Sequence, residues 1–141
     1  MQLPNLFSRY ALIGATALTM GLLVYGCGEN KISQCNKIVA IANKTKAVAV
    51  PQDITGFNQF ADSLDQIRTE IQAIAIQDSK LKALQTELIG MYGDVSLALK
   101  AQVAAKEAKD ANAQNKAKQD LETAAGKESD LVDRLNALCT K

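Results

Sequence analysis

The spacing of its large apolar residues most constrains how this chain folds. From residue 57 to 74 these residues are alternately three and four positions apart: Phe57, Phe60, Leu64, Ile67, Ile71 and Ile74. A second series of this kind runs through Leu81, Leu84, Leu88, Met91, Val95 and then Ala98 or Leu99. This spacing places the side chains on one face of an α-helix, as in helices that pack side by side. No strand-like alternation competes with it, and we therefore predict an all-α fold.

Turn and capping residues divide the chain into helices. Residues 31–50 have a helical pattern that Pro51 ends, because proline cannot continue a helix. Asp53 or Thr55 is expected to cap the second helix, and Asp78 or Ser79 the third.

The boundary after the third helix is harder to place, because residues 100–119 are rich in alanine, lysine, glutamine and asparagine. We interpret them as an extension of the third helix, a loop near 112–115 and the start of a fourth helix. The apolar face of that helix continues through Leu121, Ala124, Leu131, Leu135 and Leu138, and Gly126 is a weak point within it. The prediction is an antiparallel up-down-up-down four-helix bundle. Alternation in the sign of charge between successive segments favours the same pairing.

The first 26 residues differ from the rest, since they contain one charge, Arg9, and no acid. The uncharged run 11–24 is shorter than the ~20 apolar residues of a spanning helix and suits a signal peptide. Val24-Tyr25-Gly26-Cys27 resembles the lipobox of bacterial lipoproteins, although Tyr25 is bulkier than the pattern prefers. The resemblance implies cleavage after Gly26 and acylation of Cys27. A retained signal anchor and a plain secretory signal are the alternatives.

The expected organisation is a signal peptide at 1–26, a lipidated tether at 27–30 and a helical bundle domain at 31–141. If Cys27 carries lipid, Cys35 and Cys139 remain, and an exported compartment permits a disulfide between them. An up-down-up-down bundle would place both at the same end. Two buried, unpaired thiols are the alternative, and a redox pair is disfavoured because no Cys-x-x-Cys motif is present.

Composition excludes several classes of function. The chain has no histidine, which removes Ser-His-Asp and Cys-His catalysis and histidine-based zinc sites. An aromatic content of 4% and a formal net charge of +1 argue against nucleic-acid binding. Asp62/Asp65 and Asp130/Asp133 are acids three apart that could hold a cation only if another helix supplied partners. We expect no enzyme, no metal and no cofactor.

Several short stretches make the chain similar to small cyanobacterial lipoproteins of unassigned function. They are Gln34-Cys35-Asn36, residues 57–64, residues 77–81, Met91-Tyr92 and Leu138-Cys139. The resemblance implies a bacterial envelope or thylakoid-lumen setting and carries no activity with it.

The functional hypothesis is a membrane-tethered, non-catalytic interaction or structural module with a protein partner. The expected partner-facing residues are Lys106, Lys109, Lys116 and Lys118. One alternative is a carrier of a small apolar ligand between the helices. The other is a coiled-coil oligomer in which the 57–74 series packs against another chain.

Overall fold

The computed structural model describes residues 30–140, and those residues form helices and contain no strand. They confirm the all-α prediction. The signal peptide, the lipobox and Cys27 lie outside the described residues. In chain order the elements are α2 (Lys31–Ala42), the 3-10 helices η1 (Asn43–Ala47) and η2 (Ile54–Gly56), α3 (Phe57–Gln72), α4 (Ser79–Glu107), α5 (Ala111–Ala125) and α6 (Glu128–Cys139).

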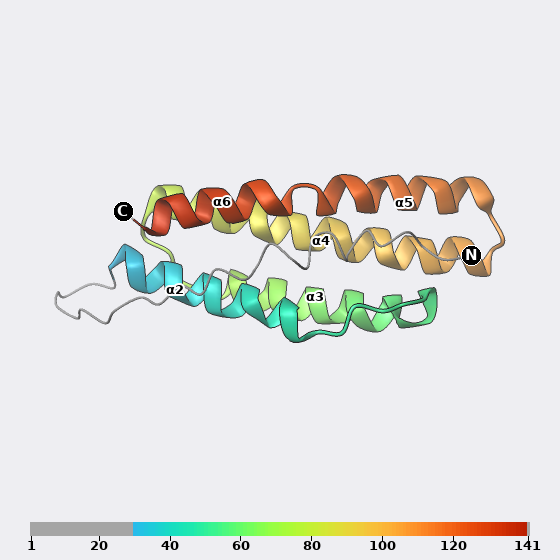
Figure 1. The fold of residues 1–141 in the computed structure, drawn as a ribbon, viewed down its shortest axis with the longest axis horizontal. Coiled ribbons are helices and arrows are strands. Elements are labelled where there is room, and N and C mark those ends of the chain that lie inside the picture. Colours follow the sequence, from blue (N-terminus) through green and yellow to red (C-terminus); the bar gives the residue numbers. More distant parts are fainter. Residues whose placement is uncertain (1–29, 141) are drawn as a thin grey trace.

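The longest helix, α4, organises the fold (Figure 1). It packs against α3 and also against α5 and α6, which follow one another along its length. The short helix α2 contacts α3, α6 and α4. The start of α2 and the C-terminal end of α6 therefore lie at one end of the molecule, while the connection between α4 and α5 lies at the other. We call these the disulfide end and the distal end.

Side-chain caps define three helix starts. The Asn30 side chain accepts a hydrogen bond from the Ser33 N–H at 2.8 Å, and the Asp78 side chain accepts one from the Leu81 N–H at 2.9 Å. Asp110 caps α5 in the same way through the Ala113 N–H at 3.0 Å. Each carboxylate or amide oxygen satisfies one of the backbone donors that a helix start leaves unpaired. Of the two candidates for the third helix, Asp78 is the cap.

Three predicted boundaries are wrong. The first helix ends at Ala42 and tightens into η1, where the Thr45 hydroxyl donates to the Ala42 carbonyl at 2.7 Å. Residues 48–50 are not helical, and Val50, the residue before Pro51, is held out of the helical region by steric contact with the proline ring. In the second helix, Asp53 caps only η2, and α3 starts at Phe57.

The third error is the predicted loop at 112–115, which lies inside α5. The chain turns earlier, at 108–110, where Lys109 adopts a left-handed φ of 55° and Asp110 then caps the new helix. The predicted weak point at Gly126 is confirmed, because α5 ends at Ala125 and α6 begins at Glu128.

The apolar series meet in one core. The whole 57–74 series is buried within the chain, as are both Ala98 and Leu99 at the end of the α4 series. A coiled-coil oligomer that used the 57–74 series would have to expose this core, because the series is not available on the surface of the single chain. From the last helical segment, Leu121, Ala124, Leu131 and Leu135 are buried and Leu138 is partly buried.

Two buried glutamines fasten the connection between α3 and α4. The Gln85 amide nitrogen donates to the carbonyls of Ile71 and Ile74, at 2.7 and 2.9 Å. The Gln34 side-chain oxygen accepts from the Gln77 N–H at 2.8 Å. These bonds satisfy backbone groups at the C-terminal end of α3 and beyond it, where a helix leaves carbonyls unpaired.

Candidate functional site

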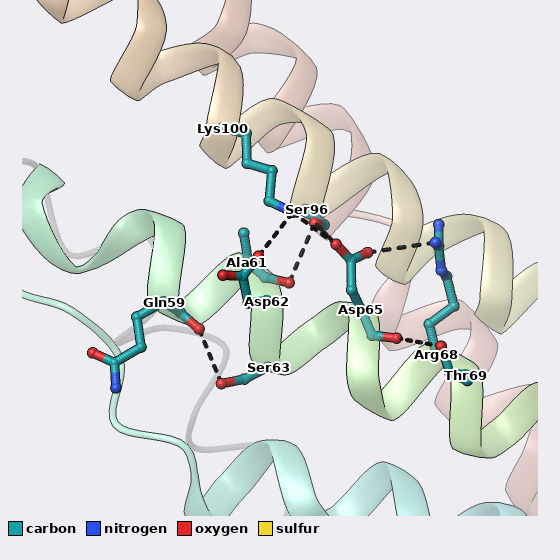
Figure 2. Close-up of polar contacts among 9 residues, drawn as sticks. All are labelled: Gln59, Ala61, Asp62, Ser63, Asp65, Arg68, Thr69, Ser96 and Lys100. Carbon is teal, nitrogen blue, oxygen red and sulfur yellow. Dashed lines mark hydrogen bonds and ion pairs between the residues drawn. The ribbon is translucent and has the colours of Figure 1, made fainter.

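A group of polar side chains lies between α3 and α4 (Figure 2). We call it the α3–α4 polar cluster, made of Asp62, Asp65, Arg68, Ser96 and Lys100. The α3 members are three positions apart, and the α4 members are four apart. Each set therefore projects from one side of its helix toward the other helix.

Asp65 is the centre of the cluster. Its Oδ2 accepts from the Ser96 hydroxyl at 2.9 Å and from Lys100 Nζ at 2.9 Å. Its Oδ1 lies 3.6 Å from Arg68 Nη2. Lys100 Nζ also lies 2.9 Å from Asp62 Oδ1, so one ammonium bridges two carboxylates of α3 (Figure 2). The Ser96 hydroxyl additionally approaches the Ala61 carbonyl at 3.3 Å.

Gly93 makes room for the cluster on α4. A Cβ atom at this position would lie 2.7 Å from Arg68 Nη1, closer than real Cβ atoms come to another heavy atom. The absence of a side chain therefore lets the Arg68 guanidinium lie against α4. Gly90 differs, because a Cβ there would meet nothing within 4 Å.

The electrostatics of the cluster favour holding two helices together. Burial raises the pKa of Asp65, but hydrogen bonds from Lys100 and Ser96 outweigh it and leave the pKa below its ordinary value of 3.8. Hydrogen bonds to Asp65 and Asp62 raise the pKa of Lys100, so its ammonium stays protonated. A general base must accept a proton near the working pH. The low pKa of Asp65 and the protonated ammonium of Lys100 therefore make both groups unsuited to act as a base for the Ser96 hydroxyl. Ser96 itself is only 2% exposed.

Replacing Asp65 by alanine tests whether the α3–α4 polar cluster holds α3 and α4 together. We expect the free energy of unfolding to fall by about 1–3 kcal/mol at neutral pH, because the buried Ser96 hydroxyl loses a charged acceptor. Asp65 has a lower pKa in the folded state than in the unfolded state. Its contribution to the free energy of unfolding is therefore fully present above the unfolded pKa and is lost as the pH falls below 3.8. Urea unfolding at neutral pH and near pH 3 should therefore show a smaller difference from wild type in acid.

Asp62→Ala is the matched control, because the Asp62 side chain is 71% exposed and pairs with Lys100 alone. Exposed ion pairs contribute about 0–1 kcal/mol. Equal losses in the two variants would contradict the central role of Asp65.

A second polar group lies where η1, α4 and α6 meet. Tyr92 of α4 is buried, and Thr45 of η1 lies close to its hydroxyl. Burial raises the pKa of Tyr92, and the neighbouring Glu128 carboxylate raises it further. Burial also raises the pKa of Glu128, while Lys46 opposes that shift.

The structure joins Cys35 and Cys139 in a disulfide, as predicted, with their Cα atoms 5.8 Å apart. Both residues are buried, one in α2 and the other at the last position of α6. The bond thus connects the first and last described helices at the disulfide end.

The four predicted partner-facing lysines all come from the C-terminal part of α4, the following turn and α5. Lys116 Nζ lies 2.7 Å from Asp120 Oδ2, and Lys118 Nζ lies 4.0 Å from Glu122 Oε1. These two cations are therefore partly neutralised within α5. Lys106 lies near Asp53, whose pKa is lowered mainly by hydrogen bonds from Thr55 and only slightly by the Lys106 charge.

The ion pairs between helices could not be predicted from the sequence. The acids Asp62 and Asp65 do find a partner on another helix, but it is the Lys100 ammonium. Asp130 pairs instead with Arg134 of its own helix, and Arg134 reaches across to Glu87 of α4 with two bonds of 2.7 Å. Lys44 pairs with Glu70, and Lys127 with Asp94. The only advance signal was the alternation in the sign of charge between segments.

The described residues contain no group of three or more histidine, cysteine or acidic side chains placed to hold a metal ion. None of the helices within residues 30–140 is long and apolar enough to cross a membrane. Two open hollows lie along α4, with volumes of about 450 and 480 Å³.

No protein-family model, curated protein or solved structure matches this chain.

Proposed function

We propose that the chain is a bacterial lipoprotein whose helical body is a non-catalytic interaction or structural module. In this proposal Cys27 carries the lipid, and the body faces the periplasm or the thylakoid lumen. The observation that carries the proposal is the lipobox-like run Val24–Cys27 directly before the helical body. Only residues 28–30 separate Cys27 from α2, and Asn30 caps that helix. The anchor would therefore be attached at the disulfide end.

We further infer an up-down-up-down arrangement of four rods: α2, α3, α4, and α5 together with α6. The packing of α4 against α3 and against α5 and α6 supports this arrangement. So do the short connections 73–78 and 108–110, because short links between long helices make antiparallel neighbours. A closed, disulfide-joined body on a lipid would present the outer faces of its helices to a partner.

The mass of the intact protein purified from a bacterial membrane tests the anchor. We expect the mass of residues 27–141 increased by acyl chains, because a lipobox directs cleavage before an acylated cysteine. Two or more acyl chains are needed for stable anchoring. Cys27→Ser should lose the acyl increment, whereas Cys139→Ser should keep it. An unmodified 141-residue chain would indicate a retained signal, and a cleaved chain without acyl mass a secretory signal; either would overturn the proposal.

The interaction role is tested with the same protein, tagged at its C-terminus and released from membranes with a mild detergent. A module of this kind should retain a second protein in a fixed ratio. Recovery without any other protein would contradict a role in binding a different partner, and would do so independently of the result for Cys27.

A further inference from the structure

The outward side of α4 has an unusual composition for a solvent-exposed surface. Six exposed residues are spaced alternately four and three apart along α4 and its C-cap: Gly90, Asp94, Leu97, Ala101, Ala104 and Ala108. We call them the outer α4 face. Leu97 is 68% exposed, the highest value among the large apolar side chains of the described residues. A single charged residue, Asp94, lies within this face.

Leu97 stands between the two hollows on α4. The hollow toward the disulfide end is lined by Gly90, Asp94 and Leu131, among others, and the distal one by Ala101, Ala104 and Ala108. The face therefore carries a projecting apolar side chain with a depression on either side. Small side chains on both sides allow another helix to approach closely, as interaxial distance depends on the side chains at the contact.

This pattern is self-complementary in one orientation. If a second α4 lies antiparallel with Leu97 opposite Leu97, then Gly90 is opposite Ala104, and each hollow faces the other hollow of the second copy. A two-fold interface of this kind uses the same patch on both subunits. A parallel, in-register pair would instead place Asp94 opposite Asp94.

Charge favours the antiparallel orientation. Asp94 then faces an alanine, Ala101, and no carboxylates meet on the face. Most of the charged side chains that border the face pair within the chain: Lys127 with Asp94 at 3.1 Å, Lys116 with Asp120 at 2.7 Å, and Lys100 with Asp62 and Asp65 at 2.9 Å. Asp110, which also lines the distal hollow, caps α5 through the Ala113 N–H instead. These pairs reduce the net charge that two copies would bring together along their borders.

We propose that the outer α4 face binds the same face of a second copy of this chain, antiparallel, with Leu97 at the two-fold axis. From residue 90 to 108 the face is roughly 27 Å long at 1.5 Å per residue and about 10 Å wide. With its flanks it buries on the order of 1,000 Å² in total, at the lower limit of specific interfaces. The dimer is therefore weak, and a covalent trap is the suitable probe. The proposal does not depend on acylation of Cys27.

Leu97→Cys in the full chain, treated with a mild oxidant and run on a non-reducing gel, provides that trap. We expect a reducible dimer, because a residue on the two-fold axis meets its own copy within disulfide reach. Ala108→Cys is the matched control on the same face. Antiparallel pairing separates its two copies by roughly 33 Å along the helix, far beyond the ~7 Å limit between Cα atoms.

Cross-linking of Leu97→Cys with none at Ala108→Cys supports the proposal. Cross-linking of both variants would indicate a parallel pair or exchange through Cys35 and Cys139, and would overturn the antiparallel arrangement. Absence of a dimer in both would overturn the interface itself. The Cys27→Ser background gives the same readout without lipid, so failure here is distinguishable from failure of the proposed anchor.

Discussion

Replacing Cys35 and Cys139 together by alanine is expected to lower the free energy of unfolding by about 4–5 kcal/mol. The disulfide joins residues 104 positions apart, so it restricts nearly the whole described chain in the unfolded state. Long closed loops lose the most unfolded-state entropy in the chain-entropy model. For a body of this size the loss corresponds to a fall in melting temperature of roughly 15–30 °C. Thermal unfolding followed by circular dichroism measures it directly.

Reduction of the wild-type protein is the control for that variant. Reduced wild type and the double alanine variant lack the same cross-link, so their melting temperatures should be close. The variant is expected to melt slightly lower, because it also loses two buried sulfur atoms. A double variant that melts within a few degrees of oxidised wild type would contradict the prediction. It would mean that packing of α2 and α6 holds the disulfide end without the bond.

The helices were predictable because burial on one side of a helix is a local, periodic signal. The series from Phe57 to Ile74 requires only its own spacing to indicate α3, and the structure buries all of it. The disulfide was predictable for a related reason: the predicted alternation in helix direction puts Cys35 and Cys139 at the same end. In both cases a simple rule connects sequence positions to places in the fold.

The helix breaks were less predictable because several polar residues compete to cap or end a helix. Asp110 and Asn112 are both good capping residues, and sequence alone favoured the wrong place for the loop. Alanine-rich sequence carries α4 on to Glu107, and Lys109 then adopts a left-handed conformation that non-glycine residues rarely adopt. Nothing in the local pattern at Lys109 indicates that turn.

The α3–α4 polar cluster could not be predicted because it depends on the register of two helices. Asp65 and Ser96 are 31 positions apart in the chain, and their hydrogen bond exists only at one relative placement of α3 and α4. Spacing identified Asp62 and Asp65 as a pair on one side of a helix. It contained no information about which residue of α4 would face them.

Leu99→Ala is expected to lower the free energy of unfolding by about 2–5 kcal/mol, much more than Leu97→Ala on the same helix. Leu99 is fully buried at 0% exposure, so truncation removes buried methyl groups and leaves a cavity. Urea unfolding of the full chain would measure the change in unfolding free energy. The sequence alone left Ala98 and Leu99 as alternatives for this core position, whereas the structure buries both.

Leu97→Ala is the control, because it makes the same chemical change two residues away on the same helix. Both substitutions alter helix propensity equally, so the difference between them reports burial alone. At a protein concentration too low for the proposed weak dimer, we expect Leu97→Ala to change the stability of the single chain by no more than about 0.5 kcal/mol, since surface substitutions seldom do more. Similar losses in the two variants would mean that α4 is rotated from the orientation described. Such a rotation would remove Leu97 from the outer α4 face and the proposed dimer interface with it.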